Sequence, residues 1–161
     1  MTVYIAVCGP GDAIAAERSA AEEVGRRLAE NGAVVVCGGL GGVMDAAARG
    51  ARAAGGQAIG VLPGATRTGS SPDLTASIPT GLGEARNAII VRAADAVIAI
   101  SGEFGTLSEI ALALKLGKPV IGLGTWELRK GARAVDAIIQ AESPKDAVDL
   151  AMEAAGGGEG S

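Results

Sequence analysis

The segment SGEFGTLSE, residues 101–109, combines two glycines, a threonine and two glutamates, and an apolar helical pattern follows it. A glycine-rich turn that opens a helix exposes free backbone N–H groups at the positive end of the helix dipole, and both features favour a bound anion such as phosphate. The segment therefore predicts a phosphate-binding loop. Its candidate contacts are Gly102, Glu103, Gly105 and Thr106.

Thr106 and Glu109 also have the spacing of a capping box, in which a threonine hydroxyl and a glutamate carboxylate satisfy free backbone amides at the start of a helix. The glutamate would then lie in the first helical turn, beside any phosphate bound by the preceding glycines. A capping role and a catalytic role for Glu109 are both compatible with this spacing.

Two further glycine-rich loops follow apolar runs. Their candidate ligand contacts are Gly9 and Gly11 in the first loop, and Gly38, Gly39, Gly41 and Gly42 in the second. Ile14 stands at the last position of the G-x-G-x-x-G dinucleotide fingerprint, and Pro119 follows the only Gly-Lys pair, where a P-loop needs Ser or Thr. The loops thus predict anion binding without a standard NAD or P-loop signature.

Three polar residues accompany the loops. Arg86 and Asn87 open one predicted helix, and Asp45 lies in the first turn of another. A cation in a first helical turn opposes the helix dipole unless an anion offsets it, so Arg86 is a candidate ligand contact and Asn87 is grouped with it. Asp45 suits the dipole by itself, and a ligand contact is the alternative.

Composition narrows the chemistry further. The chain has no histidine, which removes Ser-His-Asp and Cys-His catalysis and imidazole-based zinc sites. Its acids are too scattered to predict a metal cage, so no metal or cofactor is required, although Mg²⁺ could accompany a phosphate ligand. Cys8 and Cys37 each end an apolar run, and we predict buried, reduced thiols, with a reactive role as the alternative.

Short β-branched runs alternate with longer Ala-rich stretches, as in parallel sheets whose strands are joined by helices. We predict an α/β fold, a single Rossmann-like three-layer α/β/α domain over residues 1–155 with a mostly parallel sheet of about six strands. The strand candidates are VYIAVC, AVVVC, QAIGVL, AVIAI, PVIGL and AVDAIIQ. The predicted helices lie near residues 13–30, 43–54, 84–93, 106–116 and 144–155, the last capped by Ser143.

In such a sheet the carboxyl ends of the strands share one rim, where ligands bind. With a Rossmann-like strand order, the first strand and the strand at residues 96–100 are neighbours, so the loops that follow them should face each other across a crevice. Residues 63–83 are rich in Pro, Gly, Ser and Thr and predict a long functional loop. Residues 156–161 predict a disordered tail.

The segment SGEFGTLSE resembles the P-G-G-x-G-T-x-x-E motif of the Lonely Guy family, also called lysine decarboxylase-like. The matching residues are Gly102, Gly105, Thr106 and Glu109, and Arg86 matches the arginine of the family's upstream R-K segment. The resemblance covers about residues 1–123. It implies a Rossmann-like homo-oligomer that hydrolyses the N-glycosidic bond of a purine-type nucleoside 5'-monophosphate to free base and ribose 5-phosphate.

The resemblance also implies residue roles. Gly105 and Thr106 would hold the 5'-phosphate, Arg86 would orient the substrate, and Glu109 would support the ribosyl centre. A fixed carboxylate there gains attraction as oxocarbenium character develops in the transition state.

Several positions depart from the motif. Asn87 replaces the lysine of the R-K segment, Asp45 stands where many members have glycine, and Ser101 and Glu103 replace the proline and second glycine. With these departures, the sequence resembles a shorter sister branch of the superfamily. This branch is related to molybdenum-cofactor carrier proteins and distantly to DNA-processing protein A. Because Arg86 and Glu109 are both retained, hydrolysis is the first prediction. Because Glu103 and the missing P-G-G favour binding, the alternative is a non-catalytic carrier or sensor of a phosphorylated nucleotide-like cofactor.

The expected partners follow from charge and surface. A net charge of -4 and only three aromatic residues argue against nucleic acid and anionic membranes. The apolar stretches ARNAIIVRAA and EIALALKL suggest a homo-oligomer, a dimer or a tetramer. The chain starts in a strand-like segment and has no apolar run of membrane-spanning length, so we expect a cytoplasmic protein with a small-molecule ligand.

Overall fold

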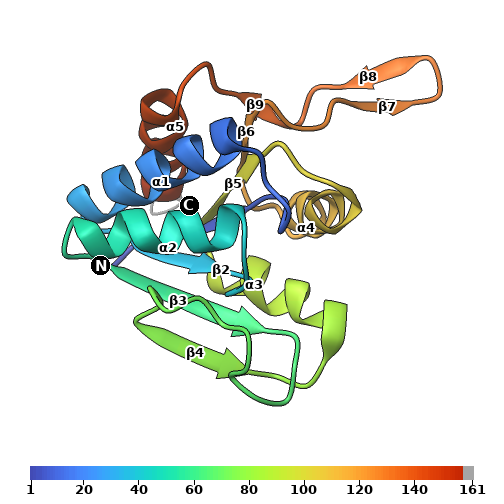
Figure 1. Cartoon of the computed structure of the whole chain (residues 1–161). Helices are drawn as coiled ribbons and strands as arrows, with labels where there is room; N and C mark the ends of the chain where they lie inside the picture. The colour runs from blue at the N-terminus through green and yellow to red at the C-terminus, as the bar shows by residue number, and fades with distance from the viewer. Residues whose placement is uncertain (158–161) are drawn as a thin grey trace.

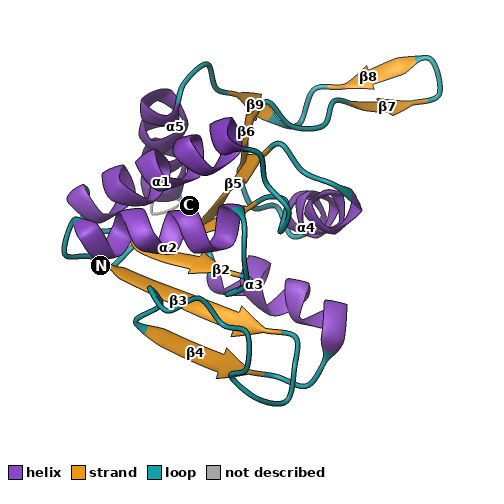
Figure 2. Cartoon of the chain, in the orientation of Figure 1, coloured by secondary structure: helices purple, strands orange, loops and turns teal. Residues whose placement is uncertain are grey.

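Runs of valine, isoleucine and alanine form a parallel sheet that lies between the helices of the folded molecule (Figures 1 and 2). The computed structural model describes residues 1–157. The strands of this sheet are β1 (Tyr4–Cys8), β2 (Val34–Cys37), β3 (Gln57–Leu62), β4 (Ala76–Pro79), β5 (Ala96–Ile100), β6 (Val120–Leu123) and β9 (Ile139–Gln140). They lie in the order β4-β3-β2-β1-β5-β6-β9, and every neighbouring pair is parallel. The α/β Rossmann-like fold is thereby confirmed.

Helices cover both faces of the sheet. On one face lie α1 (Ala15–Glu30), α2 (Val43–Ala53) and α5 (Pro144–Gly156), and on the other lie α3 (Asn87–Ala93) and α4 (Phe104–Lys115). A short 3-10 turn, η1 (Gly83–Arg86), leads into α3. Because strand side chains alternate between faces, Val35 packs in the core under α1 and α2, whereas Val36 packs in the core under α3 and α4.

Two glycines let α1 and α2 approach closely. A Cβ added at Gly25 would lie 2.0 Å from the Ala47 carbonyl oxygen, and one added at Gly50 would lie 1.9 Å from that of Glu22. Both distances are far below van der Waals contact, so the two helices touch through backbone. This contact fixes α2 and therefore the loop that precedes it.

The prediction that β1 and β5 are neighbours is confirmed, with Ile5 to Cys8 paired against Ala96 to Ala99. Ser143 caps α5 as predicted, since its Oγ accepts a hydrogen bond from the Asp146 amide at 3.1 Å. The predicted tail begins within α5, which ends at Gly156. Residues 158–161 lie outside the described part of the chain.

Two predictions about the later part of the chain were wrong. Residues 63–83 are not only loop, because β4 forms within them and pairs with β3 as the edge strand. The predicted strand AVDAIIQ is divided between β9 and an antiparallel hairpin of β7 (Leu128–Lys130) and β8 (Arg133–Val135). Among residues 1–157, no helix is long and apolar enough to cross a membrane.

Candidate functional site

A cavity of about 780 Å³ opens at the rim formed by the carboxyl ends of β1 and β5. The loop after β1 faces the start of α4 across it, as the sequence predicts, and η1 closes one side. Its size is that of a site for one small ligand. The predicted residues that line it are Gly9, Gly11, Arg86, Asn87, Glu103, Gly105, Thr106 and Glu109.

The remaining predicted residues do not line the cavity; they are Gly38, Gly39, Gly41, Gly42, Asp45 and Gly102. Most of them shape the backbone around it. An added Cβ at Gly42 would lie 2.3 Å from the Pro10 carbonyl oxygen, so the loops after β1 and β2 touch directly. Gly102 has a φ of 119°, and a Cβ added there would lie 2.5 Å from the Thr106 Cβ.

Asp45 lies outside the cavity wall and makes a contact within the protein. Its Oδ1 accepts a hydrogen bond from the Ser71 hydroxyl, and the Ser71 amide donates to the Gly39 carbonyl at 2.9 Å. Asp45 therefore ties the segment between β3 and β4 to the start of α2.

Sequence reasoning missed eight residues of the cavity wall, namely Pro10, Asp12, Leu40, Met44, Pro63, Glu84, Phe104 and Ser108. Most of them lie within or beside the loops that the glycines indicated, so proximity to those loops was the available signal. Met44 also lies beside such a loop, two residues after Gly42, but nothing in its local sequence separates it from a core methionine.

Arg86 passes over the backbone of the second glycine-rich loop. Its Nη2 donates to the Gly38 carbonyl at 3.5 Å, and an added Cβ at Gly38 would lie 2.7 Å from the same nitrogen. The Arg86 Nε–H is buried, and no group in residues 1–157 accepts a hydrogen bond from it. Gly38 thus leaves the space that the arginine needs, and one arginine N–H remains for another acceptor.

Asn87 joins Arg86 to α4. Its Oδ1 accepts a hydrogen bond from Arg86 Nη1, and its Nδ2 donates to the Ser108 hydroxyl at 3.1 Å. The Asn87 side chain is buried, and Ser108 in turn donates to the Gly105 carbonyl at 2.6 Å. This chain of hydrogen bonds places the guanidinium beside the start of α4.

Glu109 lies at the inner end of the cavity and is 8% exposed. The Cys8 thiol at the end of β1 donates to its Oε2 at 2.8 Å. Burial raises the pKa of Glu109 above its ordinary value, while the Cys8 hydrogen bond and the charge of Arg86 act in the opposite direction. Burial and the neighbouring carboxylate also raise the pKa of Cys8 well above its usual value, so this cysteine is a thiol donor rather than a thiolate nucleophile.

The predicted capping box at Thr106 and Glu109 was wrong. Helix α4 begins at Phe104, with Glu103 as the N-cap, and no side chain caps it. Thr106 is therefore inside the first turn and Glu109 is in the second, where it turns inward to Cys8. The first-turn amides of Phe104, Gly105 and Thr106 consequently have no intrahelical acceptors, and these three residues line the cavity.

The two cysteines are both free and buried, as predicted. They lie on neighbouring strands but project to opposite faces of the sheet. Cys37 donates weakly to the Met44 carbonyl in α2 at 3.8 Å, whereas Cys8 reaches α4. Burial raises the pKa of Cys37 to about 11, so both thiols stay protonated near neutral pH.

Charge in the cavity is predominantly negative. Its wall carries four carboxylates, from Asp12, Glu84, Glu103 and Glu109, and one guanidinium, from Arg86. The first three acids are exposed at the rim. Within residues 1–157, no group of three or more acidic, cysteine or histidine side chains is arranged to hold a metal ion.

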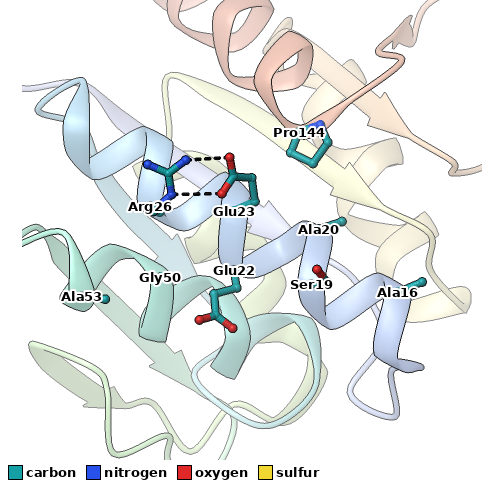
Figure 3. A pocket seen from close by; sticks show the side chains of 9 residues that line it. All are labelled: Ala16, Ser19, Ala20, Glu22, Glu23, Arg26, Gly50, Ala53 and Pro144. Atoms are coloured by element: carbon teal, nitrogen blue, oxygen red, sulfur yellow. Dashed lines mark hydrogen bonds and ion pairs between the residues drawn. The ribbon is translucent and has the colours of Figure 1, made fainter.

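A second groove, of about 730 Å³, lies between α1, α2 and the start of α5 (Figure 3). Its charged residues are in ion pairs, because Arg26 pairs with Glu23 at 2.6 Å and Glu22 pairs with Arg49 at 3.3 Å. The hydrogen bond from Arg26 lowers the pKa of Glu23 to about 2. With its charges paired and exposed, this groove offers no convergent polar groups for a ligand.

Residues 2–148 match the model of the SLOG cluster 4 family. The chain belongs to this family. An uncharacterised protein of Archaeoglobus fulgidus is 39% identical over 150 residues, which cover 93% of this chain and 95% of that protein. The family confirms the predicted placement in a sister branch of the Lonely Guy superfamily.

Solved structures extend the comparison. The molybdenum cofactor binding protein of Rippkaea orientalis is 36% identical, with a TM-score of 0.85, and the match covers 95% of this chain and 97% of that chain. The Moco carrier protein of Chlamydomonas reinhardtii is 34% identical, with a TM-score of 0.85 and coverage of 98% and 99%. DNA processing protein A of Helicobacter pylori is 20% identical over 94% of this chain and 80% of that chain, with a TM-score of 0.72, which shows a shared fold only.

Proposed function

We propose that this chain binds and carries a phosphorylated, nucleotide-like cofactor of the molybdenum-cofactor type and does not transform it. The observation that supports this most directly is the state of Glu109. Its carboxyl group lies deep in the cavity and is buried, burial raises its pKa above the ordinary value, and its Oε2 accepts the hydrogen bond of the Cys8 thiol. Burial disfavours the charged form of this carboxyl group and one of its oxygens is occupied by the Cys8 thiol, so it is less suited to stabilising a developing cation than an exposed, free carboxylate.

The cavity suits such a ligand. The free amides at the start of α4 offer donors for a phosphate, and the helix dipole favours its negative charge. Arg86 adds a guanidinium whose Nε–H lacks an acceptor within residues 1–157. The two relatives named for the molybdenum cofactor match nearly the whole chain, so the same class of small molecule is the ligand that we assign here.

The test is retention of the cofactor. Purified protein is mixed under anaerobic conditions with molybdenum cofactor released from a molybdoenzyme, and protein-bound molybdenum is measured after gel filtration, with and without Mg²⁺. We expect about one molybdenum per chain, and at least a tenfold loss in affinity for Arg86→Gln, since a charge-assisted hydrogen bond contributes about 1.5–3 kcal/mol. Arg92→Gln, an exposed arginine of α3, is the matched control and should bind normally. Failure of the wild type to retain molybdenum would refute the proposal.

The second candidate is hydrolysis of a nucleoside 5'-monophosphate, which is favoured by the presence of Arg86 and Glu109 in one cavity wall. It is tested by incubating the protein with a panel of nucleoside monophosphates and chromatographing for free base and ribose 5-phosphate. Release that Glu109→Gln abolishes would establish the hydrolase and displace the carrier proposal. Retention of molybdenum without release of base from any substrate would exclude the hydrolase.

A further inference from the structure

The β7–β8 hairpin extends away from the body of the molecule (Figure 1). Within the described residues 1–157 its two strands pair only with each other, and residues 129–137 are all exposed. A two-stranded hairpin with three-residue strands is marginally stable in water by itself. Val135 and the adjacent Ile139 also leave apolar surface uncovered, with 37% and 43% exposure. Beyond its root, where Leu128 packs against the core, the hairpin thus leaves apolar surface that a partner would cover.

The end of this hairpin, which we call the tip, is cationic. It carries Arg129, Lys130 and Arg133, and no ion pair within residues 1–157 includes any of them. The whole chain has 14 basic and 18 acidic residues, so removing these three leaves 11 basic against 18 acidic. The tip is thus a positive projection from an acidic molecule, and the body of a second copy has the opposite charge.

The acidic rim of the cavity is the surface whose chemistry fits the tip. Asp12, Glu84 and Glu103 are exposed there, and a phosphorylated ligand would meet them with only Arg86 to offset their charge. No residue of the hairpin lines the cavity of its own chain. The cavity wall has one basic side chain against four acidic ones, and the basic side chains of the tip form no ion pair within residues 1–157.

Topology places the two features on the same side of the molecule. The cavity lies at the carboxyl ends of β1 and β5, and the hairpin follows the carboxyl end of β6, the next strand in the parallel sheet. At the root of the hairpin, Trp126 packs on Phe104 of the cavity wall, with ring centroids 5.7 Å apart. Phe104 is 76% exposed, and the buried Trp126 Nε1–H has no acceptor within the described chain. A two-fold pair that apposes these rims would cover this surface twice.

We infer that a second copy of this chain receives the hairpin, so that the tip of each copy lies against the acidic rim of its partner's cavity and supplies positive charge to the bound phosphorylated ligand. The role in ligand binding rests on the proposed function, but the docking of the tip does not. Each cavity is then complete only in the assembly.

Docking is tested by cross-linking without any ligand. Cys8 and Cys37 are buried, so cysteines introduced at Lys130 and Glu103 are the reactive pair. We expect the Lys130→Cys/Glu103→Cys variant to form disulfide-linked dimers under mild oxidation, seen on a non-reducing gel. The matched variant Lys145→Cys/Glu103→Cys, whose first cysteine lies on exposed α5 surface, should remain monomeric on the gel. Equal cross-linking of the two variants, or none in the first, overturns the inference.

The shared site is tested by mixing subunits. Arg129→Gln/Lys130→Gln/Arg133→Gln lacks the tip charge, and Arg86→Gln lacks the cavity arginine; each variant alone should retain less than about a tenth of the molybdenum that the wild type retains. Co-expressed, they form mixed pairs in which one cavity is intact and faces an intact tip. Random pairing restores about a quarter of the wild-type sites. Normal retention by the tip variant alone would overturn the role in binding. Loss of retention in the wild type would refute the proposed function, and the cross-link would still decide the docking.

Discussion

The contact between Glu109 and Cys8 joins the second turn of α4 to the end of β1 inside the cavity. Burial raises the pKa of Glu109 above its ordinary value of 4.5. The folded protein therefore keeps this proton at pH values where the unfolded chain has lost it. The resulting stability is fully present below about pH 4.5 and is lost as the pH rises through the folded-state pKa.

Glu109→Gln removes this dependence, because glutamine is neutral at every pH and can still accept the Cys8 hydrogen bond. We expect the stability of the variant relative to the wild type to increase from pH 4.5 upwards, by about 1.4 kcal/mol for each unit by which folding raises the pKa. Urea denaturation of both proteins between pH 4 and pH 8 measures this difference. Glu142→Gln, at an exposed carboxylate, is the control. Parallel pH profiles for wild type and Glu109→Gln would contradict the assigned environment.

Gly38 tests the space reserved for Arg86. An added Cβ there would lie 2.6 Å from Met44 Sδ and 2.7 Å from Arg86 Nη2, which are both ends of flexible side chains. We expect Gly38→Ala to fold normally, to displace the guanidinium and to weaken cofactor binding about tenfold, since the lost polar contact is a charge-assisted one. Calorimetry and molybdenum retention measure the two effects.

Gly9→Ala is the control for that substitution, because its Cβ would meet the Ile100 backbone oxygen at 2.7 Å. Backbone cannot move as a side chain end can, so this variant should lose about 1–3 kcal/mol of stability. A Gly38→Ala variant that is equally destabilised would show that Arg86 and Met44 are not free to move.

The first turn of α4 lies at the proposed phosphate site, and it contains Gly105, a residue of low helix propensity. Gly105 has nothing within 4 Å of an added Cβ, although it lines the cavity. We expect Gly105→Ala to stabilise the protein by about 0.5–1 kcal/mol, since alanine favours the helix, while the new methyl group hinders a phosphate at the α4 amides. The same change at Gly50 in α2 is the matched control, because its Cβ would meet Glu22 backbone at 1.9 Å and should destabilise. Denaturant midpoints and cofactor affinities distinguish the two; unchanged affinity in Gly105→Ala would argue against phosphate at this helix start.

The elements that the sequence predicted well are those whose pattern is long and local. Continuous β-branched runs such as AVIAI predicted buried strands between helices, and the Ser143 cap marked the first residue of α5. Strand β4 was missed because its ASIP segment is short, half exposed and stabilised by pairing with β3 rather than by its own composition. The capping box failed because tertiary contact decided it, since Cys8, distant in sequence, took the Glu109 carboxylate.

For the candidate site too, the sequence predicted what local patterns show and missed what depends on contacts between distant residues. The glycine-rich loops located the rim, and Arg86, Thr106 and Glu109 do meet there. Local sequence could not show that Gly38 and Asp45 support the wall without lining it, because their partners lie 48 and 26 residues away. It also could not show the hairpin, whose three-residue strands carry no periodic signal.

This chain shares its fold with DNA processing protein A, which is described as binding single-stranded DNA. The net negative charge of this chain opposes binding to DNA. The chain carries a net charge of -4 and three aromatic residues, of which Phe104 and Trp126 pack on each other. Stacking platforms for single strands need several free aromatic rings in a basic groove. The cationic tip is the strongest potential contact and could neutralise at most three phosphates.

We therefore expect no binding of single-stranded DNA at physiological salt. Counterion release gives a slope of log affinity against log salt of about -0.7 for each phosphate neutralised, so three contacts would yield a slope of about -2. Fluorescence anisotropy of a labelled 30-nucleotide strand, titrated at low and physiological salt, measures this, with DNA processing protein A as the positive control. Any binding at low salt should disappear in Arg129→Gln/Lys130→Gln/Arg133→Gln. Saturable binding at physiological salt that survives in that variant would reveal a nucleic-acid surface away from the tip, and it would contradict the assignment of a small molecule as the only ligand.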